Sequence, residues 1–528
     1  MANQRPEQQK RGYLSMTSPS KGTGSLMSGF SLFAKGFHMY NQYRALREHE
    51  RNLAKIDSGE ISRLQEDTYL KIFDDAVEAG FIDPESNYGR GMYCGELKDH
   101  AGKACNFQIM SDSPAIILGR AGSFKTKSIV EQMAYRFAQA GQSIILPDIK
   151  GGELSDELVW GLKKIYGEYP SIFDPTATLG SGVTINPLSD LIEMAKTGKP
   201  VTDLAKSKAV LFRGDPGTGN NSWIGKTTMR LTWMFALFLA VESPELCMPG
   251  MLADIVTLPH DDFLKLLDEL SKSEACDGFV ATMANKFKSE YAEPSEQFEW
   301  VMADGVETFS AYLKGGALRE CTNDTNIDLA RLKNKPSALV LNDPEQLVFG
   351  HPGYYRVRTE HLINTLAYAR GNVHCNFLWD EFANYPAVEA VIRGERLYRS
   401  KKIRFILIGQ DDKSFKQYDK WGGYEALAEN SVQLILSCDG KVAELTSKKA
   451  GKHAVSIRQG GSNFGSNMTA NQGAQEILVE NLPVSVIAQG LKGKVIVDTR
   501  TDGIYVLDRP PIWDIPDLQS YRKKDITE

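Results

Sequence analysis

The stretch Ala115–Thr126, which reads AIILGRAGSFKT, is the part of the sequence that decides the fold. It begins with four apolar residues, which is typical of a short buried strand. A loop with two glycines then ends in lysine and threonine, and Ser128–Met133 continue with a helical pattern. Strand, glycine-containing loop and helix in this order are the context that a phosphate-binding P-loop requires.

In such a loop, backbone N–H groups and the N-terminus of the following helix surround the phosphate oxygens. We expect Lys125 to reach the β- and γ-phosphates of ATP and Thr126 to hold Mg²⁺. Phe124 stands where glycine is usual, and a bulky side chain resists the left-handed backbone that glycine allows. The sequence therefore predicts nucleotide binding but leaves the hydrolysis rate open, the alternative being an ordinary turn with an exposed lysine. The predicted nucleotide-binding residues are Gly119, Arg120, Ala121, Gly122, Ser123, Phe124, Lys125, Thr126 and Lys127.

A second glycine, lysine and threonine run, Gly225–Thr227, competes for this assignment. Its nearest upstream glycine, Gly219, is one residue too far away for the P-loop spacing, and no strand precedes it. Trp223 and the apolar run after Thr228 predict the start of a helix there instead.

The segment Phe377–Glu381 is an apolar strand that ends in two carboxylates, as in the Walker B element of P-loop motors. We expect Asp380 to orient Mg²⁺ or its waters, and Glu381 to polarise the water that attacks the γ-phosphate. The alternative is a pair of solvated carboxylates at a strand end.

Downstream, a predicted helix over Ala387–Tyr398 places Arg393, Arg396 and Arg399 at intervals of three residues, so that they share a face. The following strand ends before Gln410, which suits a γ-phosphate sensor because ligands gather at the carboxyl edge of open parallel sheets. Arg399 is a candidate arginine finger for a neighbour's nucleotide, although solvated arginines are the ordinary interpretation of such a stripe.

The composition describes a globular protein with no strongly basic total charge. The 528 residues are 42% hydrophobic and 24% charged, with a net charge of −6, so total charge leaves DNA binding undecided. Seven scattered cysteines without a CxxC pair favour a reducing compartment, and we expect a cytoplasmic protein. The apolar run Leu231–Val241 is too short to span a bilayer, and Phe30–Tyr40 is at most an amphipathic anchor.

Short apolar runs alternate with helical segments from Ala115 onward, which predicts an α/β fold with a mostly parallel sheet covered by helices on both faces. Between Ser189 and Lys333 only helical segments occur, which predicts an inserted all-α domain. The expected organisation is an N-terminal tail and helical collar (1–88), a first part of the nucleotide-binding domain (89–188), the all-α domain (189–333) and a second part with Walker B and sensor (334–528).

The chain resembles the type IV coupling proteins of conjugation and type IV secretion, within the FtsK-HerA group of RecA-like ring ATPases. The resemblance covers about 89–518 and includes the segment after the glutamine motif, 430–451. The features that match, in order, are the P-loop at Gly119–Thr126, Pro147–Gly151, Phe173–Pro175 with Asn186–Leu188, Trp379–Phe382 and Arg404–Gln410.

This resemblance implies a hexamer with ATP and Mg²⁺ at subunit interfaces, and a central channel for single- or double-stranded DNA, bound independently of sequence. It also implies a relaxase or secreted effector as cargo and inner-membrane components of the secretion system as partners. Mapped onto this sequence, Lys125 and Thr126 are the P-loop pair, Asp380 and Glu381 the Walker B pair, Gln410 the sensor and Arg399 the finger. Most members begin with two transmembrane helices; because this sequence has none, we expect peripheral contact with the inner membrane through a partner or through Phe30–Tyr40.

Two other functions remain open at this stage. One is a docking platform of the same fold with weakened catalysis, for which Phe124 is the sign. The other is a packaging or chromosome-pumping motor of the FtsK-HerA group. The five retained groups Lys125, Thr126, Asp380, Glu381 and Gln410 favour hydrolysis over the platform.

Overall fold

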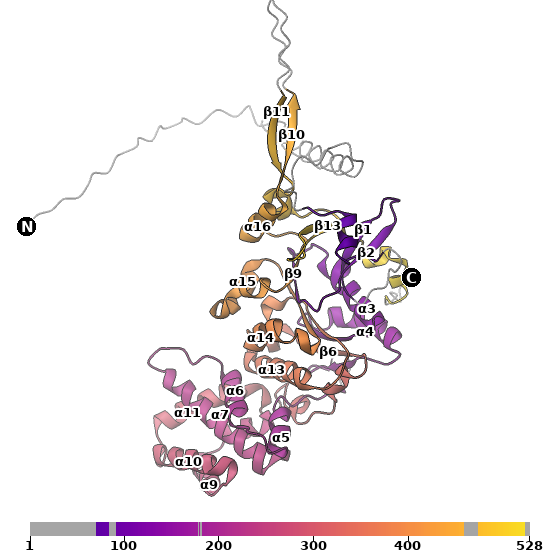
Figure 1. The fold of residues 1–528 in the computed structure, drawn as a ribbon. Coiled ribbons are helices and arrows are strands. Elements are labelled where there is room, and N and C mark those ends of the chain that lie inside the picture. The colour runs from indigo at the N-terminus through magenta and orange to yellow at the C-terminus, as the bar shows by residue number, and fades with distance from the viewer. Residues whose placement is uncertain (1–69, 84–90, 178, 180–181, 459–473, 523–528) are drawn as a thin grey trace, which may run out of the picture. The chain divides into compact units, whose positions relative to one another are not determined.

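The computed structural model describes residues 70–83, 91–177, 179, 182–458 and 474–522. Its main feature is an 11-stranded sheet. In chain order the strands of this sheet are β1 (Met92–Lys98), β2 (Ala104–Ile109), β3 (Ala115–Leu118), β4 (Ser143–Asp148), β5 (Ser171–Phe173), β6 (Ala338–Asn342), β7 (Cys375–Trp379), β8 (Ile403–Gly409), β9 (Val432–Ile435), β12 (Lys494–Asp498) and β13 (Ile504–Asp508). Across the sheet they follow the order β2-β1-β13-β12-β9-β3-β8-β7-β4-β6-β5. Figure 1 labels β1, β2, β6, β9 and β13 of this sheet.

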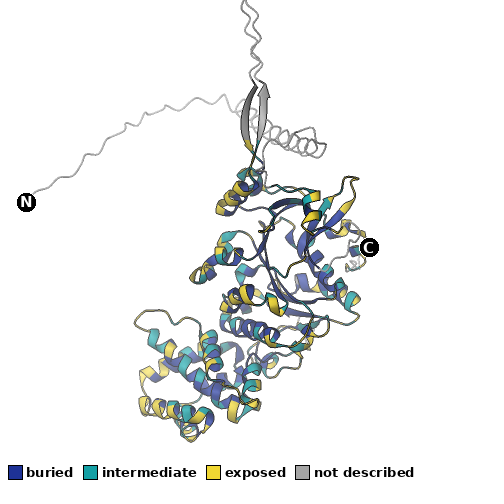
Figure 2. Ribbon diagram, in the orientation of Figure 1, coloured by how far each residue is buried: buried dark blue, intermediate teal, exposed yellow. Residues whose placement is uncertain are grey.

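The half of the sheet from β9 to β5 is parallel throughout. Every residue of β3, β4, β6, β7 and β8 is buried, and Figure 2 shows the centre of the sheet in the colour of buried residues. Strands covered on both faces read as continuous apolar runs, which explains why the sequence revealed them. The expected α/β fold with a mostly parallel sheet is confirmed.

The other half of the sheet is antiparallel and was not expected from the sequence. The hairpin of β1 and β2 and the hairpin of β12 and β13 extend the sheet beyond β9. In β1 the residues Glu96 and Lys98 interrupt the apolar pattern. In this half β12, from the C-terminal part of the chain, is separated from the P-loop strand β3 by β9 alone.

Helices cover both faces of the sheet. Successive residues of β3 point to opposite faces, so Ile116 lies in one hydrophobic cluster and Ile117 in the other. The cluster of Ile117 includes residues of α3 (Glu131–Gln139) and α4 (Glu153–Tyr166). The cluster of Ile116 includes residues of α13 (Pro352–Tyr368) and α14 (Glu389–Leu397).

Between β5 and β6 the described residues form helices and no strand. The helix α7 (Ser222–Glu242) packs against α6 (Thr202–Arg213), α10 (Ala275–Glu290) and α11 (Glu296–Phe309). The remaining elements here are α5 (Ser189–Lys196), α8 (Pro249–Val256), α9 (His260–Leu270) and the 3₁₀ turns η2 (Pro244–Leu246), η3 (Ser310–Tyr312), η4 (Glu320–Thr322) and η5 (Leu329–Lys333). The competing run Gly225–Thr227 lies in the first turns of α7, as the sequence predicted. None of the helices in the described part of the chain is long and apolar enough to cross a bilayer.

The remaining elements flank the sheet. They are α2 (Phe73–Glu78), α12 (Glu345–Gly350), η6 (Phe382–Asn384), η7 (Arg399–Lys401), η8 (Asp412–Trp421), α15 (Gly423–Ala428), α16 (Gly440–Ala450), the ladder of β10 (Lys452–Arg458) with β11 (Ala474–Glu480), α17 (Val484–Gln489), η9 (Ile512–Asp514) and α18 (Pro516–Gln519). The amphipathic stretch Phe30–Tyr40 and most of the expected helical collar lie outside the described residues. The domain boundaries drawn from the sequence stay a prediction.

Candidate nucleotide-binding site

The carboxyl ends of four adjacent parallel strands bring the predicted chemistry together. The strands lie in the order β3, β8, β7 and β4. The P-loop follows β3, Gln410 follows β8, Asp380 follows β7 and Lys150 follows β4. In register, Leu118 lies opposite Gly409, and the N–H of Gly119 donates to the carbonyl of Gly409 at 3.2 Å. This edge of an open parallel sheet is where such folds place their ligands.

The P-loop has the backbone of a phosphate-binding loop despite its phenylalanine. Gly122 and Phe124 have positive φ angles of 76° and 58°. A β-carbon on Gly119 would lie 2.7 Å from Oγ of Ser123, so a larger residue there would require the Ser123 side chain to move. Phe124 therefore adopts the left-handed geometry that the sequence suggested it would resist, and its ring is 64% exposed. A non-glycine residue in this region costs about 1–2 kcal/mol.

The helix after the loop begins with a turn of π-helix, η1 (Thr126–Val130), before α3. In a π-helix the N–H donates to the carbonyl five residues earlier, as the N–H of Glu131 does to the carbonyl of Thr126. Such wider turns are rare and often mark functional sites.

Lys125 folds over the loop that carries it. Its ammonium donates to the carbonyls of Gly119 and of Arg120, the latter at 3.4 Å. Burial lowers the pKa of Lys125, while the nearby carboxylates of Glu381 and Asp380 act in the opposite direction. The lysine therefore lies within electrostatic reach of the Walker B pair.

The other predicted loop residues divide into two groups. The hydroxyl of Ser123 is buried and has no hydrogen-bond partner among the described residues, so it is available to a ligand. In contrast, Arg120 forms an ion pair with Asp439, and Lys127 ion-pairs with Glu131 and Glu157. The side chains at these two positions therefore already have partners within the protein. The N–H of Arg120 donates to Ser437 Oγ at 3.0 Å.

Arg509 supports the loop from the far end of the sequence. Its guanidinium donates to the carbonyl of Ser123 at 2.9 Å and to the hydroxyl of Ser128 at 2.6 Å. Its Nε also donates to the carbonyl of Lys494 at 2.8 Å. Arg509 thus ties the P-loop and the start of its helix to the hairpin of β12 and β13.

The Walker B carboxylates lie at the end of β7. Asp380 is buried, at 2% exposure, and its Oδ1 accepts the N–H of Glu381 at 3.2 Å. Glu381 has a left-handed backbone with φ 52° and ψ 42°. The ammonium of Lys150 lies 3.0 Å from Asp380 Oδ2 and 3.6 Å from Glu381 Oε1. Backbone strain at such a position is typical of functional sites.

Gln410 and Arg399 lie beyond opposite ends of β8. Gln410 is exposed just after β8, between the P-loop and the Walker B strand. Arg399 lies in η7, before β8 starts, and donates to the carbonyl of Asn430 at 2.5 Å. Arg399 therefore lies at the start of β8, and the P-loop and Gln410 lie at the other end of the parallel strands.

The expectation of a single helical face carrying Arg393, Arg396 and Arg399 is wrong for the third residue. α14 ends at Leu397, because the chain turns through η7 and a left-handed Lys402 to enter β8. Arg393 is also engaged, with Glu360 at 3.1 Å.

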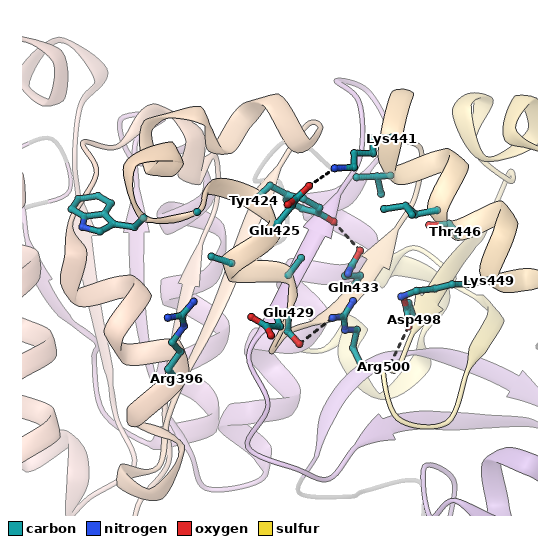
Figure 3. Close-up of a pocket in the computed structure, with 16 residues that line it drawn as sticks. Arg396, Tyr424, Glu425, Glu429, Gln433, Lys441, Thr446, Lys449, Asp498 and Arg500 are labelled. Carbon is teal, nitrogen blue, oxygen red and sulfur yellow. Dashed lines mark hydrogen bonds and ion pairs between the residues drawn. The ribbon is translucent and has the colours of Figure 1, made fainter.

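A pocket of about 610 Å³ lies away from the P-loop, between α15, α16 and β12. Figure 3 shows the ion pair of Lys441 with Glu425 among the residues that line it. Arg500 donates to the backbone carbonyl of Glu429 at 3.0 Å, and Tyr424 donates to Gln433 at 2.8 Å. These charged groups are already partnered within the chain, and none belongs to the predicted catalytic set.

The comparison with protein families identifies the family of the chain. The family described as "Type IV secretory system Conjugative DNA transfer" matches residues 64–478, well over half of the chain. The chain belongs to this family. Members are type IV coupling proteins involved in conjugative DNA transfer. Among curated proteins, none matches the sequence.

Solved structures of a coupling protein share this fold. The plasmid coupling protein TrwB in complex with the ATP analogue ADPNP superposes with a TM-score of 0.53 at 11% identity, covering 77% of this chain and 87% of that chain. TrwB in complex with ADP and Mg²⁺ gives a TM-score of 0.51 at 12% identity, covering 76% and 85%. At such low sequence identity the likeness to TrwB shows a shared fold alone.

The residues of this family member fit a magnesium nucleotide. The close packing at Gly119 and the buried hydroxyl of Ser123, which has no partner among the described residues, suit phosphate oxygens. Thr126 and the buried Asp380 would supply the hard oxygen ligands that Mg²⁺ prefers. The metal, when bound, would neutralise charge on the β- and γ-phosphates.

Arg509 is the site residue that the sequence analysis missed. It lies in the segment Asp498–Pro511, with which the family resemblance closes, but no role was expected for it, and it meets Ser123 across 386 positions of sequence. Lys150 was noted only as part of a family-like segment. Its position four residues after the apolar run Ser143–Leu146 was the available signal.

Proposed function

We propose that the chain is a Mg²⁺-dependent ATPase that drives the transfer of DNA with its attached relaxase, or of a secreted effector, to a type IV secretion channel. The observation that carries this proposal is the convergence of Lys125, Thr126, Asp380, Glu381 and Gln410 at the carboxyl ends of three adjacent strands, β3, β8 and β7. An ATPase needs phosphate cradle, metal ligand, base and sensor within reach of one γ-phosphate, and these strand ends supply one of each.

Each residue has a defined part in this proposal. Lys125 and the loop amides hold the phosphates, and Thr126 with Asp380 holds the metal. Glu381 accepts hydrogen bonds from the attacking water, because its carboxylate is partly exposed beside the buried Asp380. Gln410 lies between them and would detect the γ-phosphate.

The ring is part of the same proposal. Arg399 lies before the start of β8, whereas the P-loop lies beyond the carboxyl ends of the parallel strands. The role of Arg399 as an arginine finger therefore requires a second subunit whose P-loop faces it. A hexamer would supply this arrangement and a channel for DNA. Phosphate attraction would make DNA binding independent of sequence and sensitive to salt.

The test is ATP hydrolysis by the purified chain over a series of protein concentrations, with and without single-stranded DNA, at two salt concentrations. The proposal predicts a specific activity that rises with protein concentration, because sites complete themselves between subunits, and that rises again with DNA at low salt. A specific ATPase activity that changes neither with protein concentration nor with DNA would favour a docking platform of the same fold.

A further inference from the structure

Lys150 is the one cation that contacts both Walker B carboxylates in the described part of the chain. Its ammonium lies 3.0 Å from Asp380 Oδ2 and 3.6 Å from Glu381 Oε1. Asp380 is almost fully buried, whereas the Lys150 side chain is 34% exposed. The carboxylates are therefore fixed, and the lysine has access to solvent and to a ligand.

The turn after β4 holds Lys150 in this position. The buried Asp148 accepts the N–H of Lys150 at 3.0 Å through Oδ1, and the N–H and hydroxyl of Ser155 at 2.8 and 2.7 Å through Oδ2. A carboxylate with these partners fixes the backbone of the turn between β4 and α4. These bonds hold the backbone of Lys150, from which its side chain extends to Asp380 and Glu381.

The same carboxylates are the ones expected to hold the metal. Asp380 Oδ1 already accepts the N–H of Glu381, so Oδ2, which Lys150 contacts, is the oxygen that faces the ligand side. An ammonium and a divalent cation beside one carboxylate repel each other, so binding of the metal weakens the contact with Lys150. Lys125 is part of the same cluster, since its pKa responds to Asp380, Glu381 and Lys150 together.

We propose that Lys150 is a positioning residue that serves as an internal counter-ion of Asp380 and Glu381 and makes divalent-cation binding there conditional on a bound nucleotide. Without phosphate, the ammonium neutralises the pair and keeps the metal affinity low. A bound nucleotide offers the ammonium a new anionic partner in its phosphates, and the carboxylates then become available to the metal. This inference rests on the proposed function, because it takes Asp380 as a metal ligand.

The experiment is a titration of the full chain with Mn²⁺, a paramagnetic substitute for Mg²⁺, followed by electron paramagnetic resonance without nucleotide. Lys150→Met keeps the length of the side chain and removes its charge. We expect this variant to bind Mn²⁺ about tenfold more tightly than the wild type, because the carboxylates lose their partner. With saturating ADP the two proteins should differ by less than about threefold, because the ammonium then has another anion.

Three further variants make the result specific. Lys150→Arg keeps the charge and should behave like the wild type. Adding Asp380→Asn to Lys150→Met should abolish the gain, which assigns the bound Mn²⁺ to this carboxylate. Lys335→Met removes a lysine that ion-pairs with Glu168 on the surface and should leave Mn²⁺ affinity unchanged.

Equal Mn²⁺ affinity in the wild type and Lys150→Met would overturn the inference, as would a gain that survives Asp380→Asn. The measurement needs no hydrolysis. If Lys150→Met binds Mn²⁺ more tightly than the wild type but the chain hydrolyses no ATP, the counter-ion role of Lys150 is supported and only the proposed ATPase is contradicted. If the chain hydrolyses ATP but Lys150→Met binds Mn²⁺ no more tightly, only the counter-ion role is contradicted.

Discussion

The guanidinium of Arg509 donates to the backbone carbonyl of Ser123, inside the P-loop, at a distance of 2.9 Å. This bond joins the end of β13 to the loop that is expected to hold phosphate. Arg509 is about half-buried, and burial lowers the pKa of its guanidinium. The loop is therefore fixed by a charged hydrogen bond as well as by its own glycines.

Arg509→Met should loosen the P-loop. A hydrogen bond to a charged group contributes about 1.5–3 kcal/mol, so we expect the Kd for ADP to rise by roughly tenfold or more. Fluorescent-nucleotide titration measures this directly. Arg331→Met, which removes a surface ion pair with Glu168, is the matched control and should leave the Kd unchanged. An unchanged Kd in Arg509→Met would show that the loop holds its shape without this bond.

Substitutions at Phe124 should reveal the cost of its left-handed backbone. Glycine is ordinarily less stable than alanine in ordered structure, but at φ 58° the order should reverse. We expect the free energy of unfolding of Phe124→Gly to exceed that of Phe124→Ala by about 1 kcal/mol, measured by urea denaturation. The two variants lose the same exposed ring, so the comparison isolates the backbone. The opposite order of stability would mean that the loop does not hold this conformation.

Glu395 should give the stability a pH dependence. Its carboxyl is 2% exposed on α14, and burial raises its pKa well above the ordinary value of 4.5. The folded state then binds a proton that the unfolded state releases, so the free energy of unfolding falls as pH rises above 4.5 until the folded carboxyl ionises. We expect urea denaturation from pH 5 to pH 8 to show that the free energy of unfolding of Glu395→Gln increases relative to that of the wild type as pH rises. The increase should be at most about 1.4 kcal/mol per pH unit. A constant difference between the two proteins would contradict the raised pKa.

The buried pair of Arg358 and Asp343 should be the most sensitive ion pair in the fold. Its two bonds measure 2.5 and 2.6 Å, both side chains are at most 1% exposed, and Tyr385 from the turn after the Walker B pair donates to Asp343 at 3.2 Å. Asp343→Ala leaves the guanidinium buried without its partner, so we expect a loss of about 3–5 kcal/mol in urea denaturation.

Removing both charges, in Arg358→Met with Asp343→Leu, should cost less than removing Asp343 alone, because no buried charge is left unpaired. Breaking the surface pair of Arg331 and Glu168 serves as the reference and should cost at most about 1 kcal/mol. A loss for Asp343→Ala as small as this reference would contradict the burial of the pair.

Much of the parallel half of the sheet could be predicted because its strands are apolar along their whole length. The run 115–118 coincides with β3, and the run Phe405–Ile408 lies within β8. The antiparallel half could not be predicted in the same way, because β1 contains Gly95, Glu96 and Lys98 and pairs with residues about 400 positions away. Such pairing depends on the tertiary structure and leaves no local pattern.

The candidate site also contains residues that the sequence predicted and conformations that it did not. The P-loop, the Walker B pair and Gln410 each follow a recognisable strand, and the fold brings them to one edge. The left-handed backbone of Phe124 contradicts its residue preference, because the surrounding loop determines the conformation. Arg399 was placed on a helix that ends two residues earlier, since Lys402 turns the chain without the glycine that would have signalled the turn.

The most direct test of the ATPase is a comparison of Mg²⁺-dependent ATP turnover and nucleotide binding in the wild type, Lys125→Ala and Glu381→Gln. The account predicts that Glu381→Gln binds ATP like the wild type but loses turnover by about 100-fold or more, because only the group that activates water is removed. Lys125→Ala should lose binding and turnover together. Equal turnover in all three proteins would contradict hydrolysis at this site.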